Sequence, residues 1–269
     1  MNLDLQQITE DVKSLALEAG RFLLEQRATF DISRVQTKRS HDYVSYVDKE
    51  SERRIVERLK QIVPQAGFVT EEGTVKDSHA GGEDYCWVID PLDGTTNYIH
   101  NNEPFCVSIA LKDKNEILVG VVYECTRNEL FWANKNTKSY LNGNEIHVSA
   151  VDSADNAFIQ LGLPYDAESY RAFLTRLIGN LYGRVGGVRI MGSAAAEICY
   201  VAAGRFEARI EAFLCPWDIA AASLILKQAG GLTTNFQGEV ITDNGYTVLA
   251  SNGRLHSQML ELVKEFSVN

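Results

Sequence analysis

The sequence predicts an α/β protein built from two halves, and three observations support that fold class. The chain opens with two segments in which apolar residues recur at three- and four-residue steps, the spacing of amphipathic helices. Three apolar strands separated by polar turns follow and indicate an antiparallel sheet. After about residue 151 strands and helices alternate, as in layered α/β proteins. At 269 residues the chain is long enough for two parts, which we expect at 1–150 and 151–269.

The first half is expected to hold two helices and five strands. The apolar stripe from Leu5 to Leu23 predicts the opening helix. A second helix is expected from about Lys49, and Pro64 ends it because the residue before a proline avoids helical geometry. The expected strands are 67–70, 85–89, 105–111, 117–123 and 130–133, and a turn is expected at 142–144.

The second half is expected to alternate between the two kinds of element. The Gly230-Gly231 pair is typical of a helical C-terminus and sets the end of one helix. Strands are expected at 157–162, 206–211 and 246–251, and helices at 168–180, 194–203, 216–230 and from 254 onward.

Composition argues for a soluble globular protein and against several kinds of partner. A formal net charge of −10 argues against nucleic acid and anionic membranes, which bind through Lys and Arg clusters. The five cysteines are odd in number, and none has metal-ligand spacing, which argues against a disulfide framework or zinc site. The first 30 residues contain no unbroken apolar stretch of the kind found in a signal peptide or membrane span. We therefore expect a cytoplasmic protein with no nucleic-acid or membrane partner.

Two aspartates directly follow the apolar segment at 85–89. We expect the strand to end at Asp90 and Pro91 to fix a bend, so that Asp90 and Asp93 face one point. Carboxylates are preferred ligands of Mg²⁺, and a helix beginning at Gly94 would direct backbone N–H groups toward a phosphate. The same residues also fit an ordinary surface turn.

Four further acids lie near the predicted ends of other elements. Glu71 and Glu72 directly follow a predicted strand, Asp218 lies in the first turn of a predicted helix, and Asp48 stands just before another. Each also has an ordinary explanation, as a solvated loop residue, a helix-stabilising acid or an N-cap. The residues by themselves leave both explanations open.

Five blocks follow one another along the chain, namely residues 38–49, TEEG at 70–73, WVIDPLDGTTN at 87–97, GSAA at 192–195 and PWDIAAA at 216–222. Taken together and in this order, they resemble the inositol monophosphatase family of lithium-sensitive, magnesium-dependent sugar phosphatases. The resemblance extends over nearly the whole chain. It implies an α/β/α/β/α layered sandwich of the sugar phosphatase type, with an antiparallel sheet in the N-terminal half and a mixed sheet in the C-terminal half. It also implies a homodimer.

The resemblance further implies a phosphatase with two to three Mg²⁺ ions in each active site. Glu71, Asp90 and the backbone carbonyl of Leu92 would hold one ion, and Asp90, Asp93 and Asp218 a second. A third ion would be held more loosely near Glu71 and Glu72. Bound cations would explain how an acidic protein accepts an anionic substrate. Inhibition by Li⁺ at the second position is also expected.

The same resemblance implies how water and phosphate are handled. Asp48 and Thr95 match the positions that orient and deprotonate the attacking water, and Glu71 joins them as a catalytic residue. Gly94 and Thr95 would supply N–H groups to the phosphate.

At the substrate end, the resemblance assigns a hydroxyl contact to Glu211, with further contacts from Ser193, Ala194 and Asp218. The tail at 96–100 resembles the inositol phosphatase branch, so we expect myo-inositol monophosphates or related small polyol phosphates as substrates. The alternatives are a nucleotide bisphosphate, fructose 1,6-bisphosphate, histidinol phosphate or NADP in the same fold. A regulatory binding protein with incidental activity is another alternative.

Overall fold

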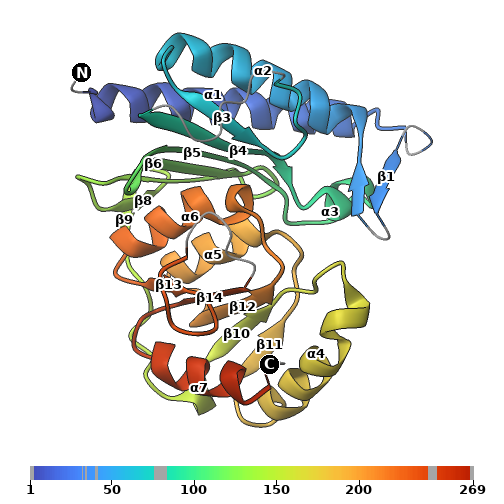
Figure 1. The fold of residues 1–269 in the computed structure, drawn as a ribbon, viewed down its shortest axis with the longest axis vertical. Helices are drawn as coiled ribbons and strands as arrows, with labels where there is room; N and C mark the ends of the chain where they lie inside the picture. Colours follow the sequence, from blue (N-terminus) through green and yellow to red (C-terminus); the bar gives the residue numbers. More distant parts are fainter. Residues whose placement is uncertain are drawn as a thin grey trace.

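Five layers stack in the computed structural model, which describes residues 3–31, 33, 35–39, 42–75, 84–241 and 247–266. The layers are, in order, helices α1 (Leu5–Arg27) and α2 (Tyr46–Ile62), a seven-stranded sheet, helices α5 (Ala194–Ala202) and α6 (Pro216–Gln228), a five-stranded sheet, and helices α4 (Ala167–Leu181) and α7 (His256–Phe266) (Figure 1). The expected α/β/α/β/α sandwich is confirmed.

The seven-stranded sheet belongs to the first half of the chain. Its strands, in spatial order, are β3 (Gly67–Thr70), β4 (Tyr85–Asp93), β5 (Cys106–Asp113), β6 (Ile117–Glu124), β7 (Glu129–Asn134), β8 (Ser139–Leu141) and β9 (Asn144–Ile146). All neighbours pair antiparallel except β3 and β4, which are parallel. The expectation of an antiparallel sheet is therefore wrong at this edge. Residues 71–84 provide the long connection that a parallel pair requires, whereas a hairpin needs only a short turn.

The five-stranded sheet is mixed, as expected. Its strands, in spatial order, are β11 (Gly187–Arg189), β10 (Phe158–Leu161), β12 (Ala208–Ala212), β14 (Thr247–Ser251) and β13 (Leu232–Thr234). The pairs made by β10 with β11 and β12 are parallel, and the pairs made by β14 are antiparallel. Tyr246, the expected first residue of the last strand, lies outside the described residues.

Several short elements were not expected from the sequence. They are the antiparallel pair β1 (Gln36–Arg39) and β2 (Asp42–Val44), the strands β8, β9, β11 and β13, and the 3₁₀-helix η2 (Ala154–Asn156). A three-residue strand is too short to show an apolar alternation. The five-residue helix α3 (Thr95–Ile99) was expected, since it begins directly after Gly94.

The start of α2 differs from the expectation. The helix begins at Tyr46 instead of about Lys49, because Ser45 and Asp48 form a capping box. The Ser45 hydroxyl accepts from the Val47 N–H, and the Asp48 carboxylate accepts from the Ser45 N–H at 2.9 Å. Asp48 therefore lies inside the first turn and is not the N-cap residue.

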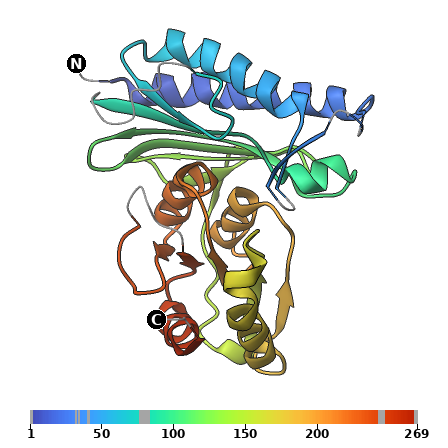
Figure 2. The same ribbon diagram turned by 45° about the vertical axis from the view of Figure 1, so that its right-hand side comes forward.

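The two halves of the chain share a core. One apolar cluster lies between α1, α2 and the seven-stranded sheet, and another lies between the five-stranded sheet and the outer helices. The middle cluster joins Val88 and Phe131 of the first half to Ile198 and Leu224 of the second. Figure 2 shows α5 and α6 enclosed between the two sheets. The expected division into 1–150 and 151–269 stays a prediction.

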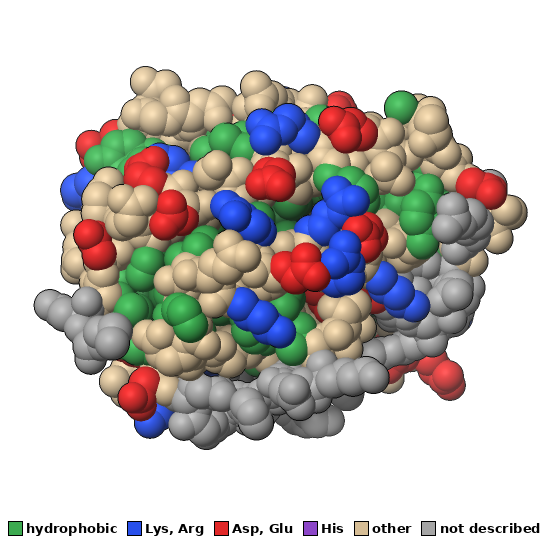
Figure 3. All heavy atoms as spheres, turned by 90° about the horizontal axis from the view of Figure 1, so that it is seen from above, with side chains coloured by type: hydrophobic (Ala, Val, Ile, Leu, Met, Phe, Trp, Pro, Cys, Tyr) green, Lys and Arg blue, Asp and Glu red, His purple; other side chains and the backbone are tan. Residues whose placement is uncertain are grey.

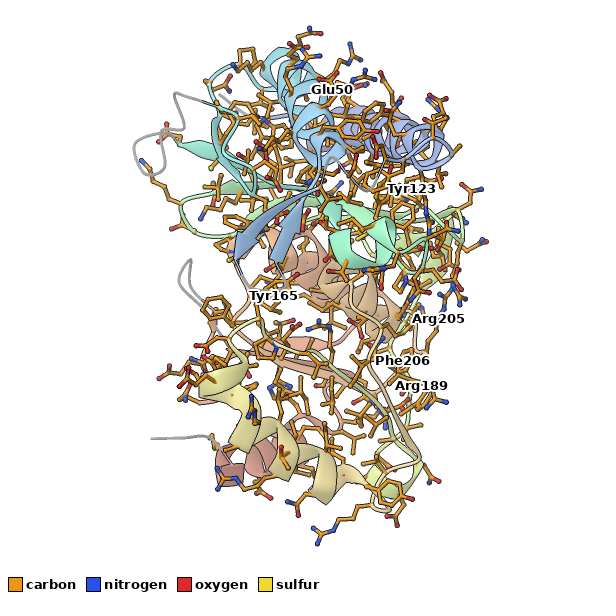
Figure 4. All side chains as sticks on the ribbon, turned by 90° about the vertical axis from the view of Figure 1, so that its right-hand side faces the viewer. Glu50, Tyr123, Tyr165, Arg189, Arg205 and Phe206 are labelled. Atoms are coloured by element: carbon orange, nitrogen blue, oxygen red, sulfur yellow. The ribbon has the colours of Figure 1, made fainter. Side chains whose placement is uncertain are left out.

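The outer face of α1 and α2 mixes charges of both signs (Figure 3). Glu50, labelled in Figure 4, accepts from Arg53 and Arg54, which lower its pKa to about 2. This face as described therefore shows no concentrated basic surface of the kind that binds phosphate backbones. Among the described residues, no helix combines the length and apolar character needed to cross a bilayer.

Candidate active site

The candidate site begins where β3 ends beside Ile89 and Asp90 of β4. Their parallel register pairs Thr70 with Ile89, and the Glu71 N–H donates to the Ile89 carbonyl at 3.3 Å. Glu71 and Asp90, the next residues of each strand, therefore lie at the same edge of the sheet. The parallel pairing that the sequence did not reveal is what brings these two carboxylates together.

The turn after Asp90 is a bulge within β4, so the expectation that the strand ends at Asp90 is wrong. Asp90 pairs with Ser108 and Asp93 pairs with Cys106, which leaves one more residue on β4 than on β5. An extra residue of this kind bends a strand and redirects its side chains. The Leu92 N–H donates to Asp90 Oδ1 at 2.9 Å and fixes that carboxylate inside the bulge.

Burial and neighbouring acids raise the pKa values of Asp90 and Asp218. Burial, followed by the charges of Glu71, Asp93 and Asp218, raises the pKa of Asp90 well above its usual range. Burial and Asp93 raise the pKa of Asp218 in the same way. After burial, the largest contributions to the raised pKa of Asp90 come from acids. Buried like charges of this kind are unfavourable unless a positive charge joins them.

The donors in this cluster fit a hard divalent cation. Carboxylate oxygens and the Leu92 carbonyl are the kind of ligand that Mg²⁺ prefers, with water filling its remaining positions. Within the described part of the chain, no three His, Cys, Asp or Glu side chains are gathered closely enough to enclose an ion by themselves. The fit therefore rests on the chemistry of the donors and on the repulsion among the acids around Asp90.

Asp48 and Thr95 are in direct contact on one side of the cluster. Thr95 Oγ1 lies 3.0 Å from Asp48 Oδ1 and 3.0 Å from the Leu92 carbonyl oxygen. The Ser45 hydroxyl donates to Asp48 Oδ2 at 2.5 Å. Burial raises the pKa of Asp48, while the Ser45 and Thr95 hydrogen bonds oppose this shift. A buried carboxylate bonded to a hydroxyl is suited to accept a proton from a nearby water.

Gly94 lets the chain turn sharply between the bulge and α3. Its φ of 89° lies in the left-handed region, and a Cβ there would lie 2.9 Å from the Pro104 carbonyl oxygen. Only glycine fits without strain. The turn brings the first N–H groups of α3 next to the acids. N–H groups at the start of a helix favour the binding of an anion such as phosphate.

Asp93 connects the bulge to the second half of the chain. It accepts from the Ser193 hydroxyl at 2.6 Å and from the N–H groups of Ala194 and Ala195 at 3.1 and 2.8 Å. These donors lie at the start of α5, so Asp93 caps a helix of another layer. Ser193 and Ala194, expected as substrate contacts, both donate to Asp93 in this structure.

Asp218 approaches from the first turn of α6, as expected. The Cys215 N–H donates to Asp218 Oδ2 at 2.6 Å, and Pro216 occupies the first turn without losing a hydrogen bond. The Ser108 hydroxyl donates to the Trp217 carbonyl at 3.3 Å and ties this helix end to β5.

Glu211 occupies β12 at the far end of the cluster. Its carboxylate accepts from the Arg209 guanidinium. Burial raises the pKa of Glu211, while Arg209 opposes that shift and Asp93 adds to it. The charge of Glu211 in turn contributes to the raised pKa of Asp218. The structure thus places the substrate-end residue in the same region as the other acids.

One buried acid near the site was missed from the sequence. Glu52 is fully buried, and its carboxylate accepts from the Glu72 N–H, the Thr74 N–H and the Thr74 hydroxyl, each at 2.7 Å. It thereby holds the segment that follows Glu71. Its position four residues after Asp48 puts both acids on one face of α2, a spacing that was available in the sequence.

Asn97 was also missed as an individual residue. Its side-chain amide donates to the carbonyls of Pro104 and Met191 at 2.8 and 2.7 Å, which joins α3 to the segment before α5. Nothing in the local sequence indicates these long-range partners.

Comparison with known proteins agrees with the geometry. The sequence matches the model of the inositol monophosphatase family over residues 4–267. It is 37% identical to Nus factor SuhB of Salmonella typhimurium over 254 residues, which cover 93% of each chain. It is 35% identical to the fructose-1,6-bisphosphatase/inositol-1-monophosphatase of Aquifex aeolicus, covering 98% of this chain and 97% of that one. Its fold is similar to the extragenic suppressor protein suhB of Bartonella henselae, with a TM-score of 0.88, 30% identity, and coverage of 96% and 99%. The chain therefore belongs to the inositol monophosphatase family.

Proposed function

We propose that this protein is a Mg²⁺-dependent phosphatase that hydrolyses myo-inositol monophosphates or related small polyol phosphates. The observation that carries the proposal is the cluster of buried acids around Asp90, which repel one another, beside the hydrogen-bonded pair Asp48–Thr95. Membership of a phosphatase family supports the reaction class. The substrate rests on the resemblance of the tail at 96–100 to the inositol phosphatase branch.

The acids would divide between two principal metal positions. Glu71, Asp90 and the Leu92 carbonyl would hold one Mg²⁺, and Asp90, Asp93 and Asp218 would hold another. When bound, the ions would supply positive charge to the phosphate ester and activate water. A third, weaker position near Glu71 is part of the proposal. Li⁺ is expected to inhibit by competing at the second position.

The remaining residues would bind the substrate and move the proton. Asp48 is suited to receive the proton of the attacking water, with Thr95 orienting that water and Glu71 as a further catalytic residue. The N–H groups of Gly94 and Thr95 would donate to phosphate oxygens. Glu211 would accept a hydrogen bond from a hydroxyl of the polyol, with Ser193, Ala194 and Asp218 around it.

We also propose that the protein is a cytoplasmic homodimer. The cysteines are odd in number and none has metal-ligand spacing, which fits a reducing compartment. Large apolar side chains are exposed around α4 and the neighbouring loops, with Tyr182 at 87% and Leu163 at 53% exposure. Such groups are common where two copies meet. Sedimentation analysis of the purified protein tests the assembly.

A phosphate-release screen tests the activity and the substrate together. Purified protein is assayed on inositol phosphates, glycerol 2-phosphate, fructose 1,6-bisphosphate, a nucleotide bisphosphate, histidinol phosphate and NADP, with and without Mg²⁺ and Li⁺. We expect Mg²⁺-dependent release that is fastest for the inositol phosphates. Negligible rates on those, beside rapid release from another compound, would overturn the substrate assignment. No release from any compound would overturn the enzyme assignment.

A second candidate function is a regulatory binding role in which phosphatase activity is incidental. It is favoured by the similarity to a protein named a Nus factor. A folded but inactive variant such as Asp48→Asn separates the two functions. If the variant restores normal growth to cells that lack this protein, the regulatory role is supported. If only the active protein does so, the phosphatase role is supported.

A further inference from the structure

A buried ion-pair cluster lies directly behind Glu211. Arg209 and Glu211 are two residues apart on β12, so their side chains emerge on the same face of the sheet. Arg209 Nη2 donates to the Glu211 carboxylate and also to Glu197 Oε2, which lies 3.3 Å away. Its Nε lies 3.4 Å from the same Glu197 oxygen. One guanidinium therefore bridges two carboxylates, one from β12 and one from α5.

Only one member of this cluster reaches the surface of the site. The side chains of Arg209 and Glu197 are 2% and 0% exposed, while that of Glu211 is 11% exposed. The charge facing a substrate is therefore the Glu211 carboxylate, with the guanidinium behind it. Arg209 cannot itself contact a substrate and can act only through Glu211.

Gly162 confines the Glu211 carboxylate from another side. Its N–H donates to the Ile210 carbonyl at 3.0 Å, which places its backbone next to β12. A Cβ on residue 162 would overlap the carboxylate of Glu211. Gly162 is not among the glycines with positive φ, so the close approach of Glu211 is what calls for glycine here.

We propose that Arg209, which Glu197 anchors, is a positioning residue that fixes Glu211 as a hydrogen-bond acceptor for a polyol hydroxyl. Glu211 held in this way disfavours substrates that carry a second phosphate at the position of that hydroxyl. The inference rests on the proposed function. A guanidinium fork can hold two carboxylates in set directions, which a single ammonium cannot reproduce. Burial raises the pKa of Glu211 and Arg209 opposes that shift, so Arg209 also favours the charged acceptor. A carboxylate held in one place accepts hydrogen bonds from neutral hydroxyls and repels a second phosphate, because both groups are negatively charged.

Two substitutions disturb Glu211 in independent ways. Arg209→Lys keeps the positive charge but removes the fork. Gly162→Ala leaves every charge in place and displaces the Glu211 carboxylate; the overlap involves the end of a flexible side chain, so the fold can absorb it. Arg205→Lys is the matched control, because Arg205 forms a comparable two-bond pair with Glu129 at 2.7 and 2.6 Å. Figure 4 shows Arg205 well apart from Tyr165, which lies just beyond Gly162 in the chain.

The test compares three substrates at saturating Mg²⁺, namely myo-inositol 1-phosphate, p-nitrophenyl phosphate, which has no hydroxyl to bind, and fructose 1,6-bisphosphate. For Arg209→Lys and Gly162→Ala we expect KM for the inositol phosphate to rise about tenfold or more, with kcat within about threefold of wild type. Kinetics on p-nitrophenyl phosphate should not change, and the preference for the inositol phosphate over the bisphosphate should fall. Arg205→Lys should match wild type on all three.

The possible outcomes separate the inference from the function on which it rests. Circular dichroism and thermal melting establish that each variant is folded, and if Arg209→Lys fails to fold, Glu197→Gln, which weakens the anchor of the Arg209 guanidinium, takes its place. If the folded variants alter all substrates equally, or alter none, Arg209 does not act through Glu211 and the inference is overturned. If wild type hydrolyses no phosphomonoester, the proposed function itself fails and the inference falls with it.

Discussion

Replacing Asp93 with asparagine separates the two tasks that the structure assigns to this side chain. Asp93 caps α5 through three hydrogen bonds, and it is one of the acids that raise the pKa values of Asp90 and Asp218. Asparagine is nearly the same shape but has one acceptor oxygen and no charge. Its best orientation keeps the bonds from Ser193 and Ala195 and turns its NH₂ toward the Ala194 N–H.

The expected effect on the metal-free fold is small. Losing one hydrogen bond to a charged group costs about 1.5–3 kcal/mol. Removing a charge from a buried group of like charges offsets part of that loss. We therefore expect the metal-free variant to lose no more than about 2 kcal/mol of its free energy of unfolding. Its Tm should fall by no more than about 8 °C for a chain of this size.

The effect on the metal-bound state should be much larger. An ion that binds the folded wild type at about one hundred times its Kd adds about 2.7 kcal/mol, which is roughly 5–10 °C in Tm. Asp93→Asn should lose most of this Mg²⁺-induced rise. It should also lose activity by about a hundredfold or more, the scale expected for removing one preorganised electrostatic group.

Thermal melts with chelator and with Mg²⁺, together with phosphate release, provide the assay. Asp166→Asn is the matched control, because Asp166 caps α4 by accepting from the Ser169 N–H at 3.1 Å, and asparagine is an equally good cap. An Asp93→Asn protein with the full Mg²⁺-induced rise would show that Asp93 binds no metal. That result would refute the two-position assignment.

Three further substitutions test other parts of the structure. In the wild type, three donors share the two carboxylate oxygens of Glu52, and Glu52→Gln leaves them only one acceptor oxygen. The Mg²⁺ concentration for half-maximal activity should therefore rise about tenfold. A metal titration of phosphate release checks this, and an unchanged midpoint would contradict the role of Glu52. Gly94→Ala should lower the free energy of unfolding by about 1–3 kcal/mol and reduce activity, because residue 94 has a left-handed φ and its Cβ would clash with the Pro104 carbonyl. Gly143→Ala is the control, because Gly143 also has a left-handed φ, of 85°, but nothing lies near its Cβ. The difference between the two losses of Tm therefore measures the clash. Burial lowers the pKa of His256, so the folded state binds its proton less readily than the unfolded state. The stability that neutral His256 contributes is complete above about pH 6.5 and is lost as the pH falls toward its folded pKa. Urea unfolding at pH 5 and pH 7.5 gives the difference in free energy of unfolding between wild type and His256→Gln. This difference should be smaller at pH 5, and an equal difference at both pH values would rule out the linkage.

Local patterns were sufficient to predict the main elements but not their partners. The strand at Gly67–Thr70 was predicted with its observed bounds, because an apolar run between polar segments is a local feature. Its parallel pairing with β4 was not predicted, since strand direction depends on a connection that the apolar pattern does not describe. The bond between Asp93 and Ser193 joins residues from different layers, and no local rule indicates it. The start of α2 was misplaced because Ser45 and Asp48 were considered separately and not as a capping box.

Three of the acids whose role the sequence left open also stabilise helix starts. Asp48 closes the capping box of α2, Asp93 caps α5, and Asp218 accepts from the N–H before α6. A helix N-terminus favours negative charge, so each carboxylate gains a local partner that partly offsets its repulsion from the others. This allows the acids to stay together while the fold forms, before any cation arrives. A capping role is therefore no argument against a ligand role here, because the caps are what makes such a concentration of negative charge compatible with a stable core.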